Sequence, residues 1–186
     1  MKYLVSIFIF VLSFYSATSQ TSTNVITHKK ITINTDPSKG AKSFIKEALF
    51  PDKNKSIRRI TMYVTLAYPE DRAIAHWDYT DRIYILYNDK ENTKFEIGRL
   101  LTPYGSNFKE GWSYTWKVDV TDFELFLHDI VEIEYVHTGY ESPDLGWDLT
   151  IDFKIDFGPP IANFISVDKM WEGNCLLYTS PSPRDS

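Results

Sequence analysis

Residues 147–157 read WDLTIDFKIDF, and this stretch decides the fold class. Apolar and polar side chains alternate along it without a break, which is the period of a β-strand with one buried face. The apolar set is Trp147, Leu149, Ile151, Phe153, Ile155 and Phe157, and the polar set is Asp148, Thr150, Asp152, Lys154 and Asp156. The pattern predicts a one-sided strand whose charged face lies in water, ended by Gly158-Pro159-Pro160.

Similar strands are expected on both sides of this one. The expected ranges are 24–35, 60–66, 83–87 with a partner strand ending at Thr102-Pro103, 112–120 and 131–137. Residues 41–50 have the composition of a short helix, but Pro51 stops them and we prefer a strand. Residues 162–167 are either a last strand or a connector. Thr121 is expected to be the N-cap of a helical turn, with Glu124 completing a capping box.

The order of these elements indicates an all-β protein. About seven to nine strands with one short helical turn, and no alternation of strands with helices, are typical of an antiparallel β-sandwich of jelly-roll type. The Trp-Asp pair at 77–78 directly precedes one alternating run, so we expect both side chains at the mouth of a sheet. A sugar could be held and a bond attacked there. The alternative is a structural corner, with Trp77 in the core and Asp78 capping a turn.

Both ends of the chain lie outside the expected fold. Lys2, an apolar run over 4–15 and small residues at 17–19 predict a signal peptide, residues 1–19, with the mature chain starting at Gln20. We therefore expect a secreted protein, periplasmic or extracellular. Residues 175–186 begin CLLYTSPSPRD, the in-frame translation of a sequencing-library adapter, and we interpret them as an artefact. The alternative is a natural Pro/Ser-rich tail.

Composition excludes several classes of function. The only cysteine is Cys175, so the rest of the chain offers neither a disulfide nor a cysteine metal site. A formal net charge of −5 argues against a nucleic-acid partner or an anionic membrane surface. Aromatic residues make up 16% of the chain, which suits a packed β core or a carbohydrate-stacking surface. For the alternating Trp112, Tyr114 and Trp116, we prefer core packing to a sugar platform.

No cofactor or metal is expected. His28, His76, His128 and His137 lie on separate elements without a His-x-His or His-His pair, so structural or surface roles are preferred to copper binding. Asp148, Asp152 and Asp156 fall on one strand face and could bind calcium. Lys154 lies among them, however, so a solvated strand face is the preferred interpretation.

Four pieces of the sequence together resemble the N-terminal domain of the peptide:N-glycosidase F family. They are Trp77-Asp78, Phe95–Arg99 with Thr102-Pro103-Tyr104, Val118–Phe123, and Asp152-Phe153 leading to Gly158. They occur in the family's order at nearly its spacing, and the resemblance covers about residues 60–167. It implies an eight-stranded jelly roll over 20–167, with 168–174 as the start of a missing second jelly-roll domain. The family comprises secreted bacterial amidases that release N-linked glycans from asparagine.

The resemblance implies roles for four residues. Asp78 matches the principal catalytic carboxylate, Trp77 would shape the site or stack on a sugar, and Tyr140 matches a cleft-lining aromatic. The family's second carboxylate aligns with Thr138, a departure, and Glu141 could replace it only through a local shift of the chain. A further carboxylate and a basic residue come from the second domain. We therefore expect an N-glycosylated protein or peptide as the substrate of the complete protein, and no activity from this chain alone.

The rival hypothesis is a non-catalytic secreted glycan- or protein-binding β-sandwich. Thr138 and the absence of the cysteine pair that the family has before its Trp-Asp favour the binding module. The intact Trp77-Asp78 favours the enzyme.

Overall fold

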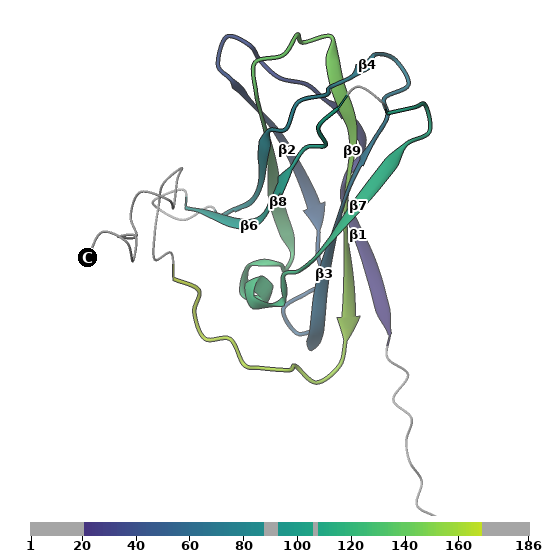
Figure 1. Ribbon diagram of the computed structural model, residues 1–186. Coiled ribbons are helices and arrows are strands. Elements are labelled where there is room, and N and C mark those ends of the chain that lie inside the picture. Colours follow the sequence, from purple (N-terminus) through teal and green to yellow (C-terminus); the bar gives the residue numbers. More distant parts are fainter. Residues whose placement is uncertain (1–20, 88–92, 106–107, 169–186) are drawn as a thin grey trace, which may run out of the picture.

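Two antiparallel sheets face each other in the computed structural model, which describes residues 21–87, 93–105 and 108–168 (Figure 1). The elements are β1 Ser22–Ile33, β2 Ala41–Leu49, β3 Ile57–Ala67, β4 Ala73–Ile74, β5 Thr80–Leu86, β6 Lys94–Leu101, β7 Ser113–Asp119, η1 Thr121–Phe126, β8 Ile130–Thr138 and β9 Leu145–Phe157. One sheet has the order β1-β9-β3-β7, with β4 pairing in parallel with β9. The other has the order β2-β8-β5-β6. The predicted jelly-roll sandwich is confirmed.

The strand expectations hold well. Within the described residues, residues 41–49 form a strand rather than a helix, and 162–167 form no strand and act as a connector. No helix in this part of the chain is long and apolar enough to cross a membrane. The residues expected to form a signal peptide and those interpreted as adapter-derived lie outside the described residues, as do residues 169–174.

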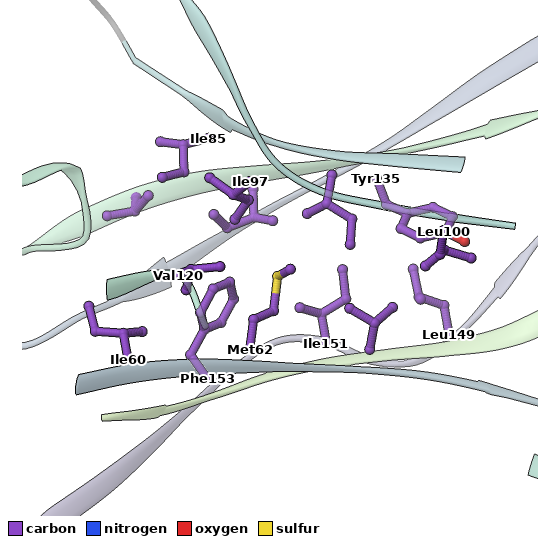
Figure 2. Close-up of a cluster of buried hydrophobic side chains, with 14 of the residues drawn as sticks. Ile60, Met62, Ile85, Ile97, Leu100, Val120, Tyr135, Leu149, Ile151 and Phe153 are labelled. Carbon is purple, nitrogen blue, oxygen red and sulfur yellow. The ribbon is translucent and has the colours of Figure 1, made fainter. Parts of the chain in front are cut away.

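The core lies between the facing sheets. Figure 2 shows Ile60, Met62 and Phe153 from one sheet directed toward Ile85, Ile97 and Tyr135 from the other. All inward side chains of β9 from Trp147 to Ile155 are fully buried, as the alternation predicted. Burial of apolar surface at about 25 cal/mol per Å² is the main force that holds the two layers together.

The capping box predicted at Thr121 is wrong. The turn is a 3₁₀-helix that starts at Thr121, its N-cap is Val120, and no side chain caps it. The Thr121 hydroxyl instead accepts the backbone N–H of Ile60 at 3.0 Å and donates to Asp119 Oδ1 at 2.5 Å. Because that hydroxyl ties η1 to the neighbouring strands β3 and β7, it is not available to cap the helix.

The charged face of β9 does not lie fully in water, contrary to the prediction. β9 is a central strand between β1 and β3, so the side chains of both neighbours cover its outer face. Asp148 is buried and accepts a hydrogen bond from Thr32 Oγ1 at 2.9 Å. In the described part of the chain, no group of three or more His, Cys, Asp or Glu side chains is arranged to hold a metal ion.

Asp152, on the same outer face of β9, lowers the stability of the folded state at neutral pH. It lies between Ile26 and Tyr63, its register partners, and its buried Oδ1 has no hydrogen-bond partner among the described residues. Burial raises the pKa of Asp152 above its ordinary 3.8. Because the folded state then binds the proton more tightly than the unfolded state, Asp152 destabilises the fold progressively as pH rises above that ordinary value.

We expect Asp152→Asn to raise the free energy of unfolding by about 1 kcal/mol at pH 7 and to have little effect at pH 3, where the carboxyl group is protonated. Urea unfolding at both pH values measures this difference. The exposed Asp122, changed to Asn, is the control and should alter stability little at either pH. A destabilised Asp152→Asn protein at pH 7 would contradict the assignment.

Of the aromatic residues at 112, 114 and 116, some pack in the core and one is exposed, as a sugar platform would require. Trp112 packs against Trp147 with ring centroids 5.4 Å apart, so it belongs to the core. Trp116 is half-buried and lies edge-on to Tyr114, with centroids 4.8 Å apart. Tyr114 is exposed on the edge strand β7. Core packing is therefore confirmed for Trp112 and for the half-buried Trp116, and it is wrong for Tyr114.

Candidate functional site

The corner formed by residues 76–79 precedes β5 and is fixed by hydrogen bonds to the end of β6. Thr102 Oγ1 donates to the carbonyl of Trp77 at 2.7 Å and accepts the N–H of Tyr79 at 2.8 Å. The Thr102 N–H donates to the carbonyl of Tyr79 at 2.9 Å, and Gly105 N–H donates to that of His76 at 2.9 Å. Four hydrogen bonds thus hold the backbone on both sides of Asp78.

Asp78 projects from this fixed corner into solvent. Its side chain is exposed, and its carboxylate has no hydrogen-bond or ion-pair partner among the described residues. Trp77 is 50% exposed and packs edge-on against Tyr104, which is 67% exposed, with ring centroids 5.4 Å apart. Trp77 therefore does not enter the core and Asp78 caps no turn. The corner presents a free carboxylate beside two exposed aromatic rings.

A second aromatic residue of the predicted site, Tyr140, follows the end of β8. It is 75% exposed, and its N–H donates to Tyr79 Oη at 3.3 Å. Gly139, just before it, donates its N–H to the carbonyl of Gly40 at 2.7 Å. The residue pair 139–140 is thereby joined both to the Asp78 corner and to the loop between β1 and β2.

Glu141 approaches the corner through His76 rather than through Asp78. Its side chain is 12% exposed, and its Oε1 lies 3.4 Å from His76 Nδ1. The same oxygen accepts the backbone N–H of His76 at 3.4 Å, while Oε2 is buried without a partner among the described residues. The structure thus brings Trp77, Asp78, Tyr140 and Glu141 to one end of the sandwich. Glu141 orients the first residue of the corner.

Thr138 joins β8 to β5 by hydrogen bonds. Its Oγ1 donates to the carbonyl of Thr80 at 2.8 Å, and its N–H donates to Asp81 Oδ1 at 3.1 Å. The position that aligns with the family's second carboxylate therefore holds β8 against β5 and carries no ionisable group.

Sequence reasoning missed several residues that build this end of the molecule. Thr102 and Tyr104 were noted only as parts of a motif. A threonine at a strand end often hydrogen-bonds to nearby backbone groups through its hydroxyl, so its role could have been suspected. A structural or surface role was expected for His137, but its buried contact with Asp81, which Tyr135 shares, was not predicted. Burial and the adjacent Asp81 carboxylate raise the pKa of Tyr135 well above its usual value.

Two other histidines have structural roles. His28 is fully buried, accepts a hydrogen bond from Thr27 Oγ1 at 2.9 Å and donates to the carbonyl of Phe44 at 3.0 Å. Burial lowers the pKa of His28, so its imidazole is held neutral. His128 lies 3.1 Å from the Pro51 carbonyl and 3.1 Å from Glu124 Oε1, at the η1 end.

Asp78, Trp77, Tyr104 and Tyr140 are all exposed at the candidate site. Two hollows of about 350 and 410 Å³ lie beside η1. Neither hollow includes a residue of the 76–79 corner or of the 138–141 segment.

Comparison with solved structures identifies the architecture. The chain aligns with peptide-N(4)-(N-acetyl-β-D-glucosaminyl)asparagine amidase at a TM-score of 0.58 and 23% identity, over 76% of this chain and 44% of that one. It aligns with PNGase F, a glycosylasparaginase from Flavobacterium meningosepticum, at a TM-score of 0.57 and 23% identity, over 76% and 43%. This chain has the peptide:N-glycosidase F fold. The resemblance predicted from the sequence is confirmed at the level of fold.

The peptide:N-glycosidase F fold is present here only in part. The chain spans under half the length of either of these structures. No family profile matches the sequence, and no curated protein matches it.

Proposed function

We propose that this chain is the Asp78-bearing part of a secreted bacterial amidase that hydrolyses the bond between N-acetylglucosamine and asparagine in N-linked glycoproteins. The observation that carries the proposal is the exposed carboxylate of Asp78, held in a fixed corner next to the exposed Trp77 on a peptide:N-glycosidase F fold. A carboxylate with no competing partner is available to activate water or to assist proton transfer.

The aromatic rings suit a sugar substrate. Trp77, Tyr104 and Tyr140 are exposed at the same end of the sandwich as Asp78, and such side chains bind ligands that are partly apolar and partly hydrogen-bonding. The open surface around Asp78 suits a bulky glycoprotein. We infer that residues 20–167 form one jelly roll and that a second jelly roll, beginning near 168–174, supplies the other wall and the remaining catalytic groups.

The second candidate function is glycan or protein binding without catalysis. Thr138 ties β8 to β5 and supplies no carboxylate, and Glu141 is engaged with His76. A protein with these features that lacked acidic groups in its second domain would keep the aromatic surface and would not hydrolyse the glycan–asparagine bond.

Glycan release by the proposed two-domain protein distinguishes these functions. We expect release from a denatured glycoprotein to fall by about a hundredfold or more in Asp78→Asn. The matched control is Asp122→Asn, an exposed carboxylate at the far end, which should release glycan at the unchanged rate. Unchanged release by Asp78→Asn would overturn the proposed role of Asp78. Glycan binding without release would establish the second candidate.

A further inference from the structure

Tyr140, the exposed aromatic residue that follows β8, lies on a glycine of the loop between β1 and β2. Gly40 is buried although it is in a turn, and its φ is +67°. A Cβ at Gly40 would lie 2.4 Å from Cζ and 2.5 Å from Oη of Tyr140, closer than real Cβ atoms approach other heavy atoms. The hydroxyl end of the Tyr140 ring therefore occupies the space that any side chain at position 40 would need.

A second glycine makes the same kind of contact one residue before Tyr140. A Cβ at Gly139, whose φ is +133°, would lie 2.4 Å from Cε2 of Tyr79. Gly139 also donates its N–H to the carbonyl of Gly40 at 2.7 Å, and Tyr79 Oη accepts the N–H of Tyr140 at 3.3 Å. Each tyrosine ring thus lies on a glycine, and hydrogen bonds join the two contacts.

The turn beneath Tyr140 is closed by hydrogen bonds to Asp36. The Asp36 carbonyl accepts the N–H of Lys39 at 3.0 Å and that of Gly40 at 2.8 Å. Its carboxylate Oδ1 accepts the N–H of Ser38 at 3.1 Å and the Ser38 hydroxyl at 2.6 Å. The backbone against which the ring packs is therefore fixed by its own contacts.

A positive φ alone does not explain these two glycines. Gly105 and Gly111 also have positive φ values, +125° and +82°, but a Cβ at either position would meet nothing within 4 Å. At Gly40 and Gly139, a tyrosine ring occupies the position of the missing side chain. Glycine at these two positions makes room for the rings as well as permitting the backbone conformation.

The packing restricts a side chain that would otherwise be mobile. Tyr140 is 75% exposed, and exposed side chains usually exchange between rotamers. Tyr79 directly follows Asp78, and its N–H and carbonyl are both held by Thr102. The Tyr140 ring is thereby fixed relative to the corner that carries Asp78. An aromatic ring that is already ordered loses less conformational entropy when a ligand binds to it.

We propose that Gly40, Gly139 and Tyr79 are positioning residues that hold the exposed ring of Tyr140 in one orientation, as a preformed platform for the sugar linked to asparagine. The ligand part of this inference rests on the proposed function. The packing part, in which Gly40 orders the Tyr140 ring, does not.

Nuclear magnetic resonance of the chain tests the packing part. In the wild-type protein we expect the three-bond couplings of a single Tyr140 χ1 rotamer and nuclear Overhauser contacts between the ring and the Gly40 Hα protons. In Gly40→Ala we expect averaged couplings and loss of these contacts. Gly111→Ala, which also has a positive φ but open space, should keep the wild-type values. A Tyr140 side chain that is averaged in the wild type, or still ordered in Gly40→Ala, overturns the inference.

Urea unfolding of single and double variants tests the same contact thermodynamically. We expect Gly40→Ala to lower the unfolding midpoint more than Gly111→Ala does. In a Tyr140→Ala background the two glycine substitutions should lower it equally, because the ring that collides with the new Cβ is gone. A Gly40→Ala effect that is the same with and without the Tyr140 ring contradicts the inference. If Gly40→Ala does not fold, folding of the double variant supports the inference and its failure to fold contradicts it.

Titration with asparagine-linked chitobiose tests the ligand part. We expect the Kd to rise by about fivefold in Gly40→Ala, the cost of ordering one side chain on binding, and to be unchanged in Gly111→Ala. In the Tyr140→Ala background, Gly40→Ala should have no further effect on the Kd. An unchanged Kd in Gly40→Ala overturns the platform role. If chitobiose does not bind the wild-type chain, the proposed function fails, and the resonance and urea measurements still decide the packing part.

Discussion

Thr102→Val is expected to loosen the Asp78 corner and to lower the free energy of unfolding by about 2–3 kcal/mol, because one hydroxyl serves two backbone groups there. Thr102 is 2% exposed. Valine has the same shape and leaves the Trp77 carbonyl and the Tyr79 N–H without their partner. The substitution changes hydrogen bonding without creating a cavity.

Two measurements test this result together. Urea unfolding gives the loss of stability, and hydrogen exchange of the Tyr79 amide shows whether the corner opens locally. Thr115→Val is the control, since Thr115 is exposed on the edge strand β7 and loss of the hydrogen bond between its hydroxyl and Thr65 Oγ1 should cost little. Equal losses in the two variants, or a Tyr79 amide that remains protected in Thr102→Val, would show that Thr102 does not hold the corner.

The strands were predictable because the information for them is local. Residues 147–157 and 60–66 alternate strictly, and a strand with one face on a core requires that alternation. The outer face of β9 was predicted incorrectly for the same reason. Whether a strand is central or at an edge depends on which strands pair with it. The alternation of side chains in β9 does not reveal that β1 and β3 flank it.

The candidate site was predictable only where a short motif carried it. Trp77-Asp78 precedes an alternating run, so its place at a sheet end followed from the sequence. The contact of Glu141 with His76 joins residues 65 positions apart through a loop, and no periodic pattern reports it. Asp81 and His137 meet because β5 and β8 pair in one register. The sequence shows a polar residue at an inward position of each strand. It does not show that the two strands pair and so make these residues neighbours.

Gly146→Ala is expected to be among the most destabilising single changes in the chain, with a loss of about 3 kcal/mol or more. A Cβ on Gly146 would lie 2.1 Å from the carbonyl oxygen of Ile33, which is backbone and cannot turn aside. Relief requires that the end of β1 separate from the start of β9, where Ile33 pairs with Trp147. The hydrogen bond from Ala75 N–H to the Gly146 carbonyl would be strained with it.

Gly98→Ala is the matched control for this effect. Both glycines are in strands and neither has a positive φ. A Cβ on Gly98 would lie 2.7 Å from Met62 Cε, the far end of a flexible side chain that can turn away. We expect Gly98→Ala to cost about 1 kcal/mol, because the methionine repacks. If urea unfolding shows equal costs for the two variants, the close approach of β1 to Gly146 is not a constraint on the fold. If Gly146→Ala is far more costly, the close approach of Ile33 to Gly146 fixes one end of the sandwich. Residues 73–77, which lead to Asp78, start from that end.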